Sequence, residues 1–152
     1  MNKEAQAMIE AIQQNELEAA VQLFKQSVEQ SVLENNSADL AELAETMHAL
    51  GFLSEAKEAY GALNYLAPQI QEWNIALAEI AIDEDDYDQA LDILLTIDKE
   101  SDVYPQALLT MADAYQVQGL YEVSEKKIFE AMALLPDEPI LDYALAQLYH
   151  SI

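Results

Sequence analysis

The sequence predicts an all-α fold, built as a stack of helix pairs, and three observations predict it. Similar residue types recur every 34 positions, with Gly51, Asp85 and Gly119 as anchors. Apolar residues follow the 3.6-residue spacing of helices. Glycine and proline are scarce, with 3 and 4 residues in 152, and most lie where predicted helices meet. A period of this length is typical of stacked two-helix units, none of which buries its apolar face alone.

Nine helices are expected from the apolar periodicity, over residues 3–14, 17–33, 38–50, 54–66, 70–83, 87–98, 104–118, 121–134 and 139–151. Five of them begin near a side chain that can cap free backbone N–H groups, namely Asn15, Ser37, Ser54, Asp86 and Asp137. Pro105 and Pro139 stand in the first turns of two helices, where a missing N–H costs nothing. Gly51 and Gly119 fall in tight turns that favour left-handed backbone, and Asp85 holds the equivalent place.

Small residues recur at the positions where paired helices must approach closely. One column, in the first helix of each pair, consists of Ala44, Ala78, Ala112 and Ala146. A second column, in the second helix, consists of Ala20, Ala56 and Ala90. A larger side chain at these places would force the two backbones apart, so the columns predict tightly packed helix pairs.

The repeating residues resemble those of the tetratricopeptide repeat (TPR) family. The first clear unit reads Leu40, Leu43, Ala44, Met47, Gly51, Leu53, Ala56, Tyr60 and Pro68. The second reads Leu77, Ala78, Ala81, Tyr87, Ala90, Leu94 and Ile97, and the third reads Leu108, Met111, Ala112, Tyr115, Gly119, Tyr121, Ala131 and Pro136. The pattern is similar to that of cytoplasmic TPR arrays of Gram-positive bacteria.

The resemblance implies one right-handed α-solenoid over residues 1–152. A degenerate repeat is expected over 1–36, with a two-residue insertion near Asn35 and Asn36, followed by repeats over 37–70, 71–104 and 105–138. Residues 139–152 would be the first helix of a further, truncated repeat. The last helix is apolar on nearly every side, whereas the end of a solenoid should have a polar outer face. We therefore expect either that more repeats follow or that another copy covers this helix.

The resemblance also implies a concave groove lined by fixed positions of the first helix in each pair. The residues expected to bind there are Glu45, His48, Glu72, Ile75, Glu79, Ile82, Asp83, Gln106, Leu109, Asp113, Gln116, Tyr143 and Gln147. Family members that bind chaperone C-termini hold a carboxylate with Lys, Arg and Asn. Here Glu45, Glu79 and Asp113 stand at such positions, which argues against that activity. An acidic and apolar groove instead favours segments carrying Lys or Arg among hydrophobic residues, unless the acids are only a solvated face.

The charge balance excludes several classes of partner. The chain has 29 acidic residues against 6 lysines, for a formal net charge of −23. Nucleic acid and anionic membranes are disfavoured because both are bound through basic side chains. No apolar run is long enough to span a bilayer, and the N-terminus lacks the apolar core of a signal peptide, so we expect a cytoplasmic protein. A basic or hydrophobic protein or peptide is the expected partner.

No catalytic, cofactor-binding or metal-binding site is expected. The acidic run over 83–88 lacks the glycine and the final glutamate that a calcium loop requires. His48 and His150 are too far apart to share a metal, and the chain has no cysteine. The sequence also lacks phosphate-binding and nucleophile motifs. We therefore expect a non-enzymatic binding scaffold or adaptor. A receptor module for an intracellular signalling peptide, and a structural protein that self-assembles or dimerises through its apolar last helix, remain open alternatives.

Overall fold

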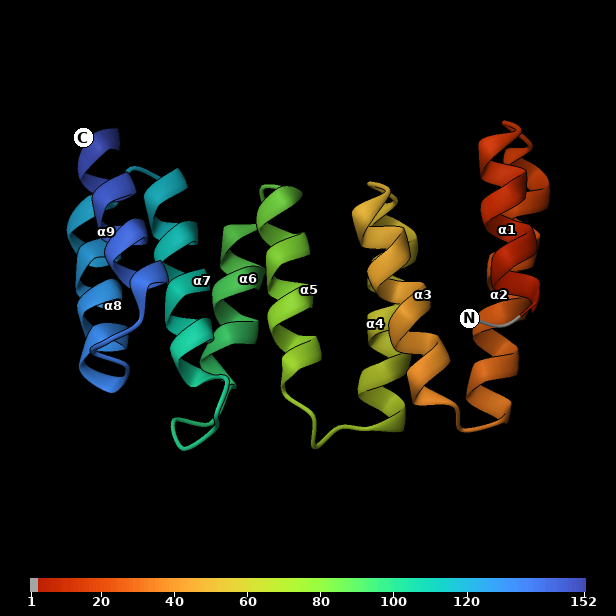
Figure 1. Ribbon diagram of the computed structural model, residues 1–152, viewed down its shortest axis with the longest axis horizontal. Helices are drawn as coiled ribbons and strands as arrows, with labels where there is room; N and C mark the ends of the chain where they lie inside the picture. Colours follow the sequence, from red (N-terminus) through yellow and green to blue (C-terminus); the bar gives the residue numbers. More distant parts are fainter. Residues whose placement is uncertain (1–2) are drawn as a thin grey trace. The chain divides into compact units, whose positions relative to one another are not determined.

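A computed structural model describes residues 3–152, and these residues form nine α-helices and no strand (Figure 1). The helices are α1 (Lys3–Gln13), α2 (Leu17–Leu33), α3 (Ser37–Ala49), α4 (Leu53–Leu66), α5 (Glu72–Asp83), α6 (Tyr87–Leu95), α7 (Tyr104–Val117), α8 (Tyr121–Leu134) and α9 (Pro139–Ser151). The predicted all-α class and the order of the helices are confirmed. The largest difference is at α6, which ends three residues early because Thr96 and Ile97 donate to the carbonyls of Ile93 and Leu94 in tighter turns.

The chain divides into two compact units, Met1–Trp73 and Asn74–Ile152, with the division inside the first turn of α5. In unit 1, α1 pairs with α2 and α3 pairs with α4, and α2 also contacts α3 and α4. In unit 2, α7 pairs with α8, α6 packs against α7, and α9 packs against both α7 and α8. Unit 1 therefore carries two neighbouring helix pairs of the kind that the 34-residue pattern predicts, and unit 2 carries the α7–α8 pair with α6 and α9 packed beside it.

The turns within the pairs have left-handed backbone at the predicted places. Gly51 and Gly119 have φ of 85° and 79°, and Asp85 has φ of 62°. Asn15 also has a positive φ, of 61°. Its prediction as the cap of α2 was wrong, because Glu16 holds that position without a side-chain hydrogen bond. A short polar side chain tolerates this conformation, so Asn and Asp replace the glycine at a small cost.

The observed caps differ in part from the predicted ones. Asp86 caps α6 as predicted, since its carboxylate accepts from the N–H of Gln89 at 3.3 Å. At α3 the cap is Asn36 rather than Ser37, and its side-chain oxygen accepts from the N–H of Asp39 at 3.1 Å. Ser54 and Asp137 are not caps either. Phe52 and Glu138 hold those positions without a side-chain bond.

The alanine columns lie in the cores of the pairs as predicted, with one exception. Ala44, Ala78 and Ala112 are buried, whereas Ala146 on α9 is exposed. In the α7–α8 pair, buried Ser124 on α8 takes the place of an alanine, and its hydroxyl donates to the carbonyl of Ala112 at 2.8 Å. That bond satisfies the hydroxyl inside a close helix contact, so a small polar residue serves there as well as alanine.

Helix α2 differs most from the repeat pattern. It has 17 residues, while α4 and α8 have 14 each. The extra residues expected near Asn35 and Asn36 therefore lengthen the helix itself, and Asn35 follows with a φ of 52°. Of the last three residues of α2, Ser31 is buried and Leu33 is exposed, so the added turn is only partly covered.

Candidate binding groove

The structure brings several predicted groove residues of unit 2 together around one hollow of about 390 Å³. We call it the acidic hollow, and it is lined by Glu79, Pro105, Gln106, Leu109, Thr110, Asp113, Leu135, Glu138, Ile140 and Leu141. Glu79 comes from α5, Asp113 from α7, and Glu138 from the cap of α9. Three carboxylates thus surround apolar side chains at this place in unit 2.

The carboxylate of Asp113 has a perturbed pKa in this hollow. It is reached by solvent, yet the surrounding protein removes enough water to raise the pKa of Asp113 above its ordinary value. Desolvation is the cause, because burial disfavours the charged form of an acid. A cation that entered the hollow would offset this loss of hydration and lower the pKa again.

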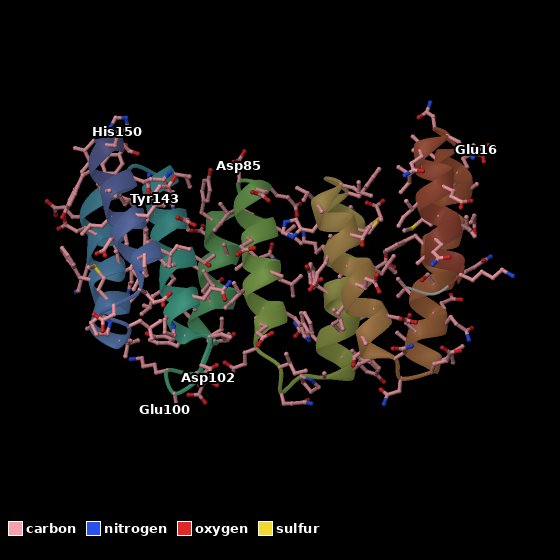
Figure 2. The ribbon with its side chains drawn as sticks, in the orientation of Figure 1. Glu16, Asp85, Glu100, Asp102, Tyr143 and His150 are labelled. Carbon is pink, nitrogen blue, oxygen red and sulfur yellow. The ribbon has the colours of Figure 1, made fainter. Side chains whose placement is uncertain are left out.

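A second hollow of about 480 Å³ lies between α7 and α9. We call it the amide hollow, and it is lined by Gln116, Tyr143, Ala146, Gln147, His150 and Ser151. The Gln116 amide donates to the Ser151 hydroxyl at 3.0 Å, and the Gln147 amide donates to the Tyr143 hydroxyl at 2.9 Å. Figure 2 labels Tyr143 and His150 along α9. This hollow has no carboxylate among its lining side chains, so it differs in charge from the acidic hollow.

The predicted groove residues of unit 1 are Glu45, His48 and Glu72. Glu45 on α3 and Glu72 at the start of α5 are exposed. The His48 ring is half-buried and meets the Tyr60 ring edge-on, with centroids 6.3 Å apart. The centroid of the Tyr60 ring lies 6.2 Å from that of Trp73, whose indole nitrogen is buried and has no hydrogen-bond acceptor among the described residues. His48 therefore belongs to a small aromatic cluster, in which edge-to-face contacts fix its ring.

Two predicted groove residues do not lie on an open surface. Ile75 is only 2% exposed and belongs to the core of unit 2 with Ala78, Ala90 and Leu94, so its prediction as a groove residue was wrong. Ile82 is half-buried and packs against the same core. The bulky side chains at these positions of α5 fill space between α5, α6 and α7 instead. Asp83, the last residue of α5, is exposed.

Six residues of the acidic hollow are not among the predicted groove residues, namely Pro105, Thr110, Leu135, Glu138, Ile140 and Leu141. Leu135 and Glu138 lie at the ends of the turn between α8 and α9, outside the positions at which the family lines its groove. Thr110 is buried, and its hydroxyl donates to the carbonyl of Gln106 at 3.0 Å. No local sequence pattern points to Glu138, because it joins the hollow through the packing of α9.

The acidic run after α5 shapes the turn that leads into α6. The Tyr87 hydroxyl donates to the Asp85 carboxylate at 2.9 Å, and this bond raises the pKa of Tyr87. Asp86 caps α6, and Figure 2 shows Asp85 at the end of α5. Within residues 3–152, no group of three or more His, Cys, Asp or Glu side chains is placed to hold a metal ion. Over the same part of the chain, no helix is long and apolar enough to cross a membrane.

Comparison with known proteins gives relatives of one kind. The chain is 36% identical over 149 residues to the TPR repeat-containing protein YpiA of Bacillus subtilis. The alignment covers 98% of this chain but 34% of the relative, so the chain spans about a third of that protein's length. A family model described as YpiA-like, tetratricopeptide repeats, matches residues 116–152. Another, described as Tetratricopeptide repeat protein 21 ARM repeat, matches residues 1–130.

Solved structures with the same fold are also TPR proteins. A tetratricopeptide repeat protein from Parabacteroides merdae superposes with a TM-score of 0.71 at 21% identity, over 97% of this chain and 57% of that one. A thermophilic TPR protein of Thermus thermophilus gives a TM-score of 0.68 at 23% identity, over 97% of this chain and 80% of that one. A tetratricopeptide repeat model matches residues 1–130, and solved TPR structures share the fold over 97% of the chain. The chain therefore belongs to the tetratricopeptide repeat family.

Proposed function

We propose that this chain is a non-enzymatic adaptor of the bacterial cytoplasm that binds a protein segment carrying Lys or Arg among hydrophobic residues. The observation that carries the proposal is the acidic hollow, where Glu79, Asp113 and Glu138 surround Leu109 and Ile140. Proteins of the TPR family generally present surfaces to other proteins and do not catalyse reactions. The hollow supplies the chemistry by which such a surface would select a basic and apolar segment.

The apolar, acidic and amide side chains of the site would each contact a different part of the bound segment. An apolar side chain of the partner would pack on Leu109, Leu135 and Ile140, which removes apolar surface from water. A lysine or arginine beside it would reach the carboxylates of Glu79 or Asp113 and offset the desolvation of Asp113. The neutral amide hollow, with Gln116 and Gln147, offers donors and acceptors to the backbone of the same segment.

Self-assembly is a second candidate function, favoured by the exposed apolar side chains of α9. Ile140 and Tyr143 are 58% and 62% exposed, and Tyr149 is about half exposed. Exposed apolar residues on one helix are typical of a surface that another protein covers. The same side chains could therefore contact a second copy of the chain rather than a different partner.

The test is affinity capture from a bacterial lysate, read by mass spectrometry. One bait is the parent chain, and a second carries Glu79→Lys and Asp113→Lys. The matched control carries Glu100→Lys and Asp102→Lys, two exposed acids of the loop before α7, which Figure 2 labels. Each pair of changes adds 4 to the net charge, from −23 to −19, because every acid-to-lysine change adds 2.

We expect one set of proteins to be captured by the parent and the control and lost from the Glu79→Lys, Asp113→Lys bait. Purified partner should then bind that variant at least about tenfold more weakly, which corresponds to about 1.4 kcal/mol. Equal loss in the two variants would mean that only total charge matters. Equal capture by all three baits would show that the acidic hollow is a solvated face.

A further inference from the structure

Unit 1 contains an apolar pocket that shares no residue with the predicted groove. Its volume is about 190 Å³, and it is lined by Met8, Ile12, Leu17, Ala20, Val21, Phe24, Met47, Phe52 and Glu55. All four helices of the unit contribute, with Phe52 at the cap of α4. Eight of these nine side chains are apolar, and the ninth is the carboxylate of Glu55.

The pocket is open past two apolar residues of α2. Leu17 and Val21 are 52% and 41% exposed, and they also line a shallow neighbouring hollow with Glu18, Ala19 and Gln22. Met8, Phe24 and Met47 form the buried floor. Small Ala20 leaves the space unfilled, since it stands where α2 approaches its neighbours and carries no further side-chain atoms.

The size and the chemistry of the pocket suit an aromatic ring. A cavity of about 150 Å³ lined by Leu, Ile and Phe stays dry and accepts benzene, so this pocket has room for one ring. The sulfurs of Met8 and Met47 and the rings of Phe24 and Phe52 make favourable contacts at the edge of an aromatic group. Water in such a pocket finds few hydrogen-bond partners and is readily displaced.

The charge around the pocket indicates which kind of residue stands beside the aromatic one in the bound segment. Glu55 lines the pocket, Glu18 lines the neighbouring hollow, and none of the described residues that line either is a lysine. A basic residue near the aromatic one would therefore be attracted. A second copy of the chain is disfavoured as the occupant because each copy carries a net charge of −23.

We propose that this pocket of unit 1 binds one aromatic side chain of a partner protein segment that carries a lysine or arginine beside it. The site lies apart from the acidic hollow in sequence and in its lining residues. It would allow the adaptor to hold a partner at two places. Changes at Glu79 and Asp113 leave every residue of this pocket untouched, so the two sites can be tested independently.

The test is NMR of the chain labelled at its methionine methyl groups. Met8 and Met47 report on the pocket, while Met111 and Met132 belong to unit 2 and serve as internal controls. The probe is a short peptide with a tryptophan between two lysines. Its matched versions replace the tryptophan by alanine, or the lysines by glutamates. Free indole is the small-molecule probe.

We expect the lysine–tryptophan peptide to shift the Met8 and Met47 signals saturably, and the alanine version to leave them in place. The glutamate version should bind at least about threefold more weakly, because Glu55 repels it. Val21→Phe, which fills the mouth of the pocket, should weaken the peptide at least about tenfold. Val123→Phe on α8 is the control, as Val123 is similarly exposed but lies in unit 2.

Several outcomes would overturn the proposal. Unmoved Met8 and Met47 signals would show that the pocket does not accept a ring. Indole binding as tightly as the peptide would indicate a small-molecule site. If the Met8 and Met47 signals shift with protein concentration in the absence of peptide, a second copy of the chain occupies the pocket. If Val21→Phe does not fold, the Glu55→Lys variant is the test. It should bind the lysine–tryptophan peptide more weakly than the parent does, and the glutamate version more tightly. Affinities equal to those of the parent would contradict the assigned partner.

Discussion

Asp113 shows how one residue connects stability with binding. Its pKa is raised by desolvation, so the folded chain holds the proton more tightly than the unfolded chain does. The stabilisation by protonation is complete below the ordinary pKa of aspartate and is lost as the pH rises through the folded-state value. Wherever the carboxylate is ionised, its desolvation lowers the stability of the fold, and a bound cation would offset that cost.

The first prediction concerns Asp113→Asn. At about pH 7 this change should raise the free energy of unfolding, by no more than about 0.5 kcal/mol because solvent reaches the group and screens its charge. This gain in unfolding free energy should shrink as the pH falls toward the ordinary pKa of aspartate. Protonation of Asp113 in the parent chain then removes the desolvation cost that the asparagine removes in the variant. Urea unfolding at several pH values measures it, with Asp102→Asn in the exposed loop as the reference. A gain that does not change with pH would contradict the assigned cause.

At the scale of the helix, Asp86 fixes where α6 begins. Its carboxylate accepts from the N–H of Gln89, one of the backbone groups left free at a helix start. Asp86→Ala should lower the free energy of unfolding by about 1 kcal/mol, and Asp86→Ser should restore most of it. Asp88→Ala in the same first turn removes an acid without removing the cap. If Asp88→Ala costs as much as Asp86→Ala in urea unfolding, the effect is electrostatic rather than a lost hydrogen bond.

The helices could be predicted because periodicity and turn residues agree along the chain, whereas caps and hollows depend on finer geometry. Asn35, Asn36 and Ser37 could all cap α3, and the left-handed backbone of Asn35 makes Asn36 the cap. Ile75 matches a groove position in the repeat, but its side chain is taken up by the core between α5, α6 and α7. Glu138 joins the acidic hollow only through the packing of α9, which no local pattern encodes.

For the molecule as a whole, the balance between a net charge of −23 and an exposed apolar helix decides whether copies associate. Repulsion between copies is screened over about 8 Å at physiological salt and about 3 Å at 1 M salt. Contacts through apolar side chains are strengthened by salts that are excluded from the protein surface. If α9 mediates self-assembly, association should therefore increase with salt, which is the opposite of binding to a basic partner.

The final prediction follows from this contrast. If α9 mediates self-assembly, sedimentation of the purified chain should give a monomer at low salt and a mass that rises with protein concentration at high salt. Tyr149→Glu on α9 should abolish the rise, because it places a charge in the apolar contact and next to Glu125, to which the Tyr149 hydroxyl donates. Tyr65→Glu on α4, equally charged and also exposed, should leave it unchanged. A monomer under all conditions would rule out self-assembly through α9 and leave binding of a different protein as the function of the exposed surface.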